Sequence, residues 1–260
     1  MTFTFRDVDG IRIRVQDSGS GAPILLIHGL GGSIDSWQES LQVFAAKHRV
    51  IVLDLPGFGQ SDKPRMTYSV RFYTDFIAHF VKSQSFPMSI VGSSLGGQIA
   101  SELAIKYPTL VSKLVLISPA GIPPFSFRGT PALRRYVRIT KAGSEEEVKQ
   151  ILVSINNGPV SDEYAKDVYQ RISMPGAREA FLSALAQSAK APRLCARLKR
   201  IHCPVMVLWG QNDQMIPAKY AAPFMGVDNY RVVLIEHSGH RPHAEAPELF
   251  RSLVLSFLAD

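Results

Sequence analysis

Residues 89–98 read SIVGSSLGGQ and place Ser94 at the centre of a Gly-x-Ser-x-Gly pattern. β-Branched residues precede the pattern, and a helix-forming run from Gln98 to Ala104 follows it. A tight turn between a strand and a helix can expose a serine hydroxyl beside backbone N–H groups, and small neighbours make such a turn sterically possible. The stretch therefore predicts a nucleophilic Ser94 at a strand-to-helix turn, with a purely structural glycine-rich turn as the alternative.

The overall composition is that of an ordinary globular protein. The chain has 260 residues, of which 46% are hydrophobic and 20% are charged. This length suits one large domain, or a core that carries an insertion. No apolar run approaches the roughly 18 residues of a membrane-spanning helix, and the first residues lack the basic and then apolar segments of a signal peptide. We expect a cytoplasmic protein that makes no contact with a membrane.

The two cysteines, Cys195 and Cys203, are too few for a disulfide framework. They lie eight positions apart with no neighbouring histidine or cysteine cluster, so they make a poor metal site. We expect buried or half-buried thiols, and neither a metal ion nor any other cofactor.

The formal net charge of +7 is concentrated in one segment. Residues 119–200 contain 14 Lys and Arg against 7 Asp and Glu, whereas the rest of the chain contains 15 of each kind. Such an excess could attract nucleic acid, an anionic substrate or a membrane. Because no recognised nucleic-acid motif or aromatic interleaving accompanies the basic residues, we favour a solvated helical surface and expect no nucleic-acid partner.

The order of apolar segments predicts an α/β fold. Apolar runs bounded by turn residues occur at residues 24–27, 50–53, 88–91 and 113–117. Helix-forming stretches separate them, at residues 37–47, 70–82 and 98–107. Near-continuous apolar strands suit a sheet that is buried on both faces. An alternating pattern around Asp9-Gly10 adds an antiparallel hairpin at the edge.

The middle of the chain interrupts this pattern. Four prolines cluster between residues 119 and 131, and basic helical segments continue to about Arg200. Strand patterns return at residues 204–209 and 230–235, before a closing helix. The middle segment is therefore predicted to be an insertion in a single sheet. The expected division is a core of residues 1–118 and 201–260 with a helical insertion of residues 119–200.

A serine nucleophile needs a base and a group that orients the base. Asp213 follows the strand pattern that ends at Trp209, and His240 follows the next strand pattern. The carboxyl ends of strands in an open α/β sheet meet at one edge, where ligands bind. We therefore expect Ser94, Asp213 and His240 to lie together as nucleophile, orienting acid and base.

Alternatives remain open for the acid and the base. Asp213 could be a turn residue or a helix N-cap ahead of Pro217. His237 and His243 are the other candidates for the base, and either could be a surface or a buried structural histidine. The glycine before His240 favours His240.

The tetrahedral intermediate of acyl transfer needs two donors for its oxyanion. One is expected to be the backbone N–H of Leu95, because this residue follows the nucleophile at the start of a helix. The other is expected to be the N–H of Leu30, in the glycine-rich loop of residues 28–32. We expect His28 and Gly29 of this loop to contact the substrate as well.

Together these motifs resemble those of the α/β-hydrolase family. The matching segments are residues 28–32, 54–62, 92–97, 209–213 and 239–243, in the family's order. The resemblance spans nearly the whole chain and implies a mostly parallel eight-stranded sheet flanked by helices. It also implies that the inserted segment forms a helical cap over the active site.

The family contains many activities, so the reaction is argued from residues. Ser94 disfavours the dehalogenases and epoxide hydrolases of the capped subgroup, which have an aspartate at that position. We expect a carboxylesterase that cleaves small to medium acyl esters through an acyl-enzyme. Hydrolases of carbon–carbon bonds in meta-cleavage products are the first alternative, because they also use serine and share a segment similar to residues 119–121. Two features speak against this alternative. Arg241 stands where that group commonly has a tryptophan, and the oxyanion loop of this chain is shorter than the glycine-rich loop of that group.

Two further alternatives are a lactonase and, outside enzymes, a ligand-sensing receptor on the same fold. The expected partner is a small-molecule ester, and the expected assembly is a monomer or homodimer. Candidates for the apolar wall of the substrate pocket are Phe125, Phe127 and Met174, although such side chains often belong to the core instead.

Overall fold

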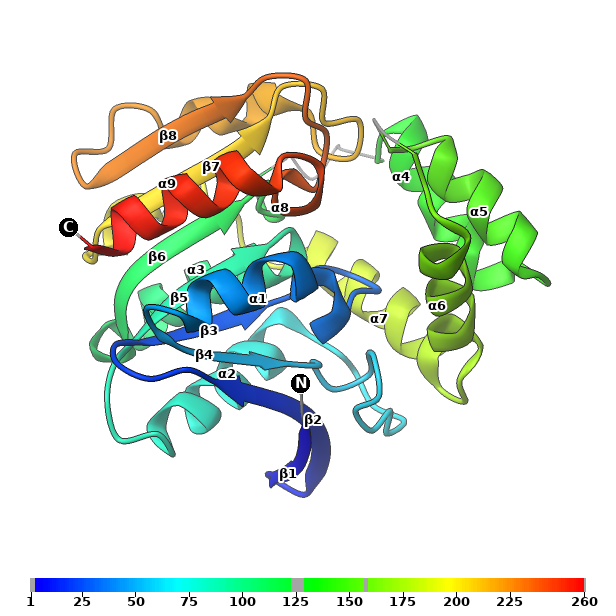
Figure 1. Ribbon diagram of the computed structural model, residues 1–260, viewed down its shortest axis with the longest axis horizontal. Helices are drawn as coiled ribbons and strands as arrows, with labels where there is room; N and C mark the ends of the chain where they lie inside the picture. Colours follow the sequence, from blue (N-terminus) through cyan, green and yellow to red (C-terminus); the bar gives the residue numbers. More distant parts are fainter. Residues whose placement is uncertain (1–2, 123–128, 157–158, 260) are drawn as a thin grey trace.

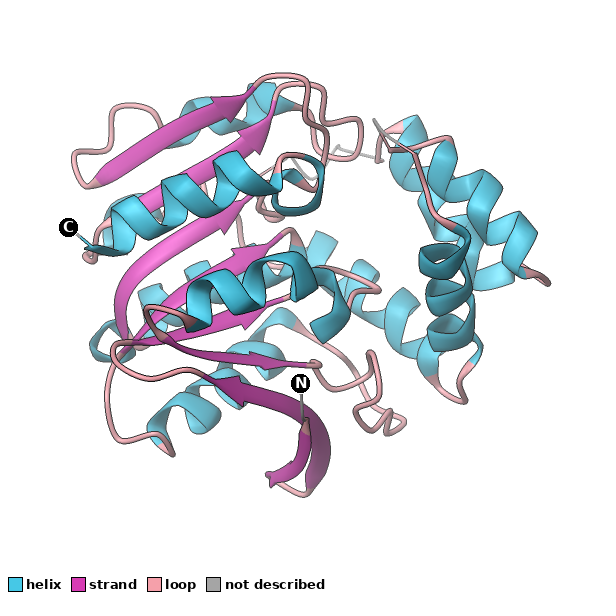
Figure 2. Ribbon diagram, viewed as in Figure 1, coloured by secondary structure: helices cyan, strands magenta, loops and turns pink. Residues whose placement is uncertain are grey.

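One eight-stranded sheet forms the centre of the protein (Figures 1 and 2). The computed structural model describes residues 3–122, 129–156 and 159–259. Strands β3 to β8 run parallel, whereas β2 pairs antiparallel with β1 and β4, so the expected mostly parallel sheet is confirmed. The strands, in spatial order, are β1 (Thr4–Val8), β2 (Ile11–Ser18), β4 (Arg49–Leu53), β3 (Pro23–Ile27), β5 (Met88–Ser93), β6 (Val111–Ile117), β7 (Val205–Gly210) and β8 (Tyr230–Ile235).

Helices cover both faces of the sheet (Figure 2). Side chains of α1 and α9 pack on one face, and those of α2 and α3 pack on the other. A short helix, α8, precedes α9. The bounds are α1 (Gln38–Ala45), α2 (Val70–Lys82), α3 (Leu95–Lys106), α8 (Pro242–Glu245) and α9 (Pro247–Ala259). Helix α3 thus begins directly after Ser94, three residues earlier than the sequence pattern suggested.

Strand β3 shows why the apolar runs are nearly continuous. Leu25 and Ile27 belong to the apolar cluster on the α2–α3 side, whereas Ile24 and Leu26 belong to the cluster on the α1–α9 side. All four side chains are buried. Successive side chains of a strand point to opposite faces, so a strand covered on both faces must be apolar at every position.

The edge hairpin forms where Asp9-Gly10 predicted it. Strands β1 and β2 pair from Thr4 with Val15 to Val8 with Ile11. Asp9 and Gly10 have φ angles of 53° and 76°, the left-handed backbone that a two-residue hairpin turn requires.

The carboxylate of Asp54, directly after β4, holds the loops at the carboxyl end of the sheet. It is fully buried and accepts hydrogen bonds from the Arg14 guanidinium and from the backbone N–H groups of Ile34 and Gln60. A Cβ atom at Gly59 would lie 2.1 Å from an Asp54 oxygen, so this turn requires glycine. The 54–62 segment is therefore built around one buried charge.

Four further helices lie beyond the carboxyl ends of the parallel strands (Figure 1). Thr130, Ser144 and Ser161 cap three of them by accepting a backbone N–H bond through the side-chain hydroxyl. These helices, called the α4–α7 segment below, are α4 (Pro131–Val137), α5 (Glu145–Val153), α6 (Asp162–Ser173) and α7 (Ala177–Lys190).

The two cysteines differ in environment. Cys203 is half-buried, and burial raises the pKa of its thiol to about 11. Cys195 is exposed, so the expectation that both thiols are at least half-buried is wrong for this residue. It lies in a polar, basic stretch after α7 that packs only its leucines inward.

Candidate active site

Ser94 occupies a strained turn between β5 and α3. Its φ and ψ angles are 53° and −112°, in a region that non-glycine residues rarely adopt. The Ser94 N–H donates to the Ile117 carbonyl at 2.8 Å, and the Ala120 N–H donates to the Ser94 carbonyl at 2.9 Å. Strain that is held in place by surrounding bonds is typical of functional residues.

The two glycines of the motif are required by close backbone contacts. A Cβ atom at Gly96 would lie 2.3 Å from the Ile27 carbonyl oxygen, and one at Gly92 would lie 2.4 Å from the Gly96 carbonyl oxygen. Real Cβ atoms do not approach so closely, so a larger residue at Gly96 would force α3 away from β3, and one at Gly92 would force α3 away from β5. The spacing of the motif therefore follows from how tightly the helix turns back against the sheet.

Asp213 and His240 form a hydrogen-bonded pair. His240 Nδ1 lies 2.8 Å from Asp213 Oδ2, and the Asp213 side chain is fully buried. The other carboxylate oxygen accepts the N–H groups of Met215 and Ile216, each at 2.8 Å. With Nδ1–H donated to this fixed carboxylate, the neutral imidazole presents an unprotonated Nε2. Such a ring can accept a proton.

The other two histidines of this region have different surroundings. His237 is exposed on the turn after β8. His243 is buried, with its ring centre 4.7 Å from that of Trp37. Burial, with the neighbouring charges of Arg241 and His240, lowers the pKa of His243 to about 3. Among the three candidates, only His240 bonds to the carboxylate of Asp213 in the described residues.

His28 orders the loop after β3. It is fully buried, its Nδ1 lies 2.7 Å from the Gly29 carbonyl oxygen, and its Nε2 accepts the Leu55 N–H at 3.0 Å. Burial lowers the pKa of this imidazole, so the neutral ring serves as donor to one backbone and acceptor to another. His28 lines the cavity described below, but both its nitrogens are already engaged by the backbone. These two bonds shape the loop, and the expected contact of His28 with a substrate stays a prediction.

The same loop approaches Ser94 closely. A Cβ atom at Gly29 would lie 3.1 Å from the Ser94 Cβ and 3.8 Å from the Ser94 Oγ. Gly31 has a φ of 72°, and Leu30 is half-buried beside it. The loop therefore lies beside the serine, where the sequence analysis expected Leu30 to donate to an oxyanion.

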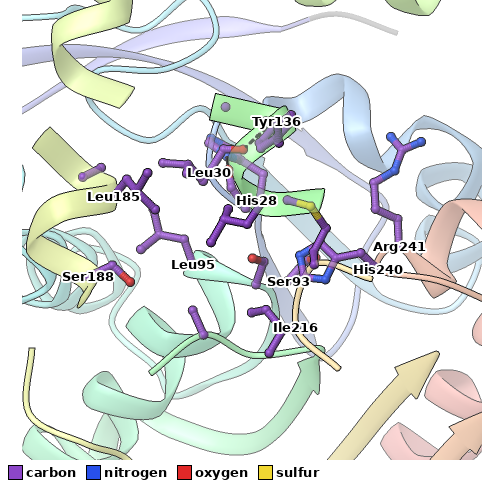
Figure 3. A pocket seen from close by; sticks show the side chains of 18 of the residues that line it. His28, Leu30, Ser93, Leu95, Tyr136, Leu185, Ser188, Ile216, His240 and Arg241 are labelled. Atoms are coloured by element: carbon purple, nitrogen blue, oxygen red, sulfur yellow. Dashed lines mark hydrogen bonds between the residues drawn. The ribbon is translucent and has the colours of Figure 1, made fainter. Parts of the chain in front are cut away.

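A cavity of about 200 Å³ opens between the sheet and the α4–α7 segment (Figure 3). Ser94 and His240 both line it, and so do Leu30 and Leu95. Figure 3 shows His240 and Ser93 on one side, with Leu185 and Ser188 of α7 on the other. Most of the remaining wall is apolar, which suits a small molecule with a hydrocarbon part.

The sequence did not predict that Tyr136, Tyr164 and Arg241 line this cavity. Tyr136 of α4 donates from its hydroxyl to the Leu30 carbonyl at 2.9 Å. Tyr164 of α6 contacts Arg241, whose guanidinium lies 4.6 Å from the centre of the tyrosine ring. Neither pairing has a local pattern in the sequence that could reveal it. Both bring the α4–α7 segment into contact with loops of the sheet.

The expected apolar wall is partly wrong. Met174 ends α6, where the chain turns toward α7, and it is not among the residues that line the cavity. The first turn of α6 reaches the cavity instead, through Tyr164, because the helix runs away from the site toward its carboxyl end. Phe125 and Phe127 lie outside the described residues.

None of the helices in ranges 3–122, 129–156 and 159–259 is both long and apolar enough to span a membrane. The same ranges contain no group of three or more histidine, cysteine or acidic residues placed to bind a metal ion.

Known proteins share the family and the fold of this chain. A family model described as alpha/beta hydrolase fold matches residues 22–247. The chain is 32% identical, across 98% of its length and 69% of the relative's, to the dihydrolipoyllysine-residue acetyltransferase component of the acetoin cleaving system of Cupriavidus necator. It is 30% identical, across 96% of its length and 92% of the relative's, to the 2-hydroxymuconate semialdehyde hydrolase of Pseudomonas sp. strain CF600. Among solved structures, a meta-cleavage product hydrolase of Pseudomonas fluorescens IP01 matches with a TM-score of 0.88 and 25% identity, over 98% of this chain and 97% of that one.

Proposed function

Since this chain belongs to the α/β-hydrolase-fold family, we propose that it hydrolyses carboxylic esters through an acyl-enzyme on Ser94. The observation that carries the proposal is the hydrogen-bonded pair of Asp213 and His240 on the same cavity as the strained Ser94 turn. A hydroxyl, an imidazole oriented by a buried carboxylate, and an apolar cavity are the parts that acyl transfer requires.

In the proposed reaction, His240 Nε2 takes the proton of the Ser94 hydroxyl as Oγ bonds to the ester carbonyl carbon. The carbonyl oxygen becomes an oxyanion, which the N–H groups of Leu30 and Leu95 stabilise. Collapse of this intermediate breaks the bond to the leaving oxygen, which receives the proton from His240. Water then attacks the acyl-enzyme with His240 as base, and the acid and free Ser94 result.

We infer that the α4–α7 segment acts as the cap of this site, and that it is the helical part of the predicted insertion of residues 119–200. It supplies the far wall of the cavity through α7 and the contact of Tyr136 with the loop after β3. A cavity of about 200 Å³ with mostly apolar walls supports acyl groups of small to medium size.

The test is hydrolysis of p-nitrophenyl esters with acyl chains of rising length. We expect turnover that depends on Ser94, with Ser94→Ala slower by several orders of magnitude. Ser89→Ala is the matched control, because Ser89 lies at the opposite end of β5, where its hydroxyl faces Ser112. Wild-type rates in Ser94→Ala would overturn the proposal.

Carbon–carbon bond hydrolysis is the second candidate, because a relative at 30% identity is named a 2-hydroxymuconate semialdehyde hydrolase. The same serine and histidine could serve it. A ring-fission product analogue and a lactone, assayed beside the esters, separate the three reactions by their kcat/KM values. A burst of acyl-enzyme followed by many turnovers supports an enzyme, whereas a single slow turnover would support a ligand sensor.

A further inference from the structure

Arg241 brings a positive charge to the cavity and has no acidic partner among the described residues. It follows His240 directly, lines the same cavity and extends away from the imidazole in Figure 3. Its Nη1 donates to the Tyr164 hydroxyl. In the part of the chain that the structure describes, no ion pair joins Arg241 to a carboxylate, since Glu245 bonds the backbone N–H groups of Gly239 and Arg241 instead.

The edge of this guanidinium formed by Nε and Nη2 makes no hydrogen bond to the described residues. Nε is buried without a hydrogen-bond partner among the described residues, and none is seen there for Nη2 either. These two donors share the edge of the guanidinium that binds carboxylates through two parallel hydrogen bonds. The guanidinium gains from an anionic ligand, because its Nε–H is a buried donor without a partner among the described residues and such a donor is unfavourable.

The rest of the cavity is compatible with an anion. None of its described lining residues is an aspartate or glutamate, and the two that carry a permanent charge are Arg193 and Arg241. Arg193 differs from Arg241 in that its Nη1 donates to the Ile122 carbonyl at 3.3 Å. Largely apolar walls weaken solvent screening, so a negative group in this cavity would feel both charges.

The position of Arg241 also indicates which part of an ester it would meet. His240 must hand its proton to the leaving oxygen, so the leaving group lies against this imidazole. The next residue along the chain is Arg241, whereas the α7 side chains line the opposite side. We propose that Arg241 forms an anion subsite that selects esters whose leaving group carries a carboxylate. This inference rests on the proposed ester hydrolysis.

The competing explanation is mechanical. Arg241 and Tyr164 join the loop after β8 to α6, so Arg241 could serve only to hold the α4–α7 segment in place. In that case its replacement would slow charged and neutral esters equally. If Arg241 forms an anion subsite, its replacement instead lowers kcat/KM more for the charged ester than for the neutral one.

The experiment compares hydrolysis of 3-butanoyloxybenzoate with that of the neutral 3-butanoyloxybenzamide. Each kcat/KM is divided by the rate constant of the same ester with hydroxide, which corrects for intrinsic reactivity. The ratio of the two corrected values, carboxylate over amide, measures the preference for the negative charge. We expect the wild-type protein to favour the carboxylate about tenfold, mostly through KM, as one charge-assisted contact allows. Arg241→Gln should bring the ratio close to one, and Arg241→Lys should keep part of it. Tyr164→Phe removes the hydroxyl but not the charge, and Arg138→Gln removes an exposed charge from the α4–α7 segment, so both should keep the ratio.

Three results would overturn the subsite. The first is a wild-type carboxylate-to-amide ratio of one or less. The second is an Arg241→Gln variant in which kcat/KM falls equally for both esters. The third is loss of the preference for the carboxylate in Arg193→Gln rather than in Arg241→Gln. Binding of 3-hydroxybenzoate and 3-hydroxybenzamide to Ser94→Ala gives a readout that needs no catalysis. If neither ester is hydrolysed, the ester function fails, and this binding comparison, with and without Arg241→Gln, still decides the subsite.

Discussion

The hydroxyl of Tyr136 donates a hydrogen bond to the carbonyl oxygen of Leu30 at 2.9 Å. This bond joins α4 to the loop after β3, across 106 positions of sequence. A Cβ atom at Gly31 would lie 2.7 Å from the same hydroxyl, so the close approach depends on that glycine. Burial raises the pKa of Tyr136, which keeps the phenol protonated as the donor. The helix beyond the sheet thereby orients the loop expected to stabilise the oxyanion.

Tyr136→Phe is expected to lower kcat/KM for an ester about fivefold, because one hydrogen bond of about 1 kcal/mol no longer orients Leu30. Steady-state hydrolysis of p-nitrophenyl butanoate measures the change. The control is Tyr169→Phe, which removes another hydroxyl-to-carbonyl bond, to Gly143, on an exposed part of the α4–α7 segment. Equal kcat/KM values for wild type and Tyr136→Phe would contradict the positioning role.

Asp213→Asn is expected to reduce kcat by about 10³ to 10⁴ while the protein stays folded. The amide oxygen can still accept the N–H groups of Met215 and Ile216, but the amide no longer holds His240 in the required tautomer. Single-turnover kinetics and circular dichroism measure the two effects. Asp228→Asn, at an exposed position, should retain full activity. A kcat within tenfold of wild type would exclude Asp213 as the orienting acid.

The unfolding free energy is expected to depend on the protonation of His243. Its folded pKa of about 3 lies below the unfolded value near 6.5, so between these values the unfolded chain binds more protons. Its contribution to stability is complete above about pH 6.5 and is lost as the pH falls, by at most about 1.4 kcal/mol per pH unit. Urea unfolding at about pH 7, 5.5 and 4.5 should show a shallower loss for His243→Phe, whose ring can still stack on Trp37.

The matched variant for this titration is His202→Gln, at an exposed position. It should lose stability with acid as the wild type does. If His243→Phe and wild type lose stability in parallel, then His243 is not held neutral in the folded protein.

Asp54→Asn is expected to lower the unfolding free energy by about 3–5 kcal/mol, because the buried Arg14 guanidinium would lose its fully buried carboxylate and keep only the partly exposed Asp35 as a charged partner. The variant that tests the importance of burial is Asp162→Asn, which breaks an ion pair with Lys149 at an exposed carboxylate. This change should cost less than about 1 kcal/mol. Similar losses in both variants, measured by chemical unfolding, would refute the structural role of the buried pair.

Local patterns account for much of the fold and for part of the candidate site. The turn at Asp9-Gly10 and the start of α2 at Val70 follow from backbone preferences that neighbouring residues set. Ser94 follows in the same way, since the glycines that permit its turn lie two positions away. The pattern failed for Met174, because amphipathic periodicity shows which face of a helix is buried but not which end approaches a cavity.

The sequence by itself determined the order of strands and helices and the positions of the serine motif and the glycine-rich loop, because apolar periodicity and the turn preferences of glycine are set by neighbouring residues. Only the tertiary structure decided which histidine pairs with Asp213, which helix reaches Leu30, and that Arg241 contacts Tyr164. These contacts join residues 27, 106 and 77 positions apart. The first contact depends on how the loops after β7 and β8 meet at the carboxyl edge of the sheet, and the other two depend on how α4 and α6 pack against that edge. No local preference encodes either arrangement.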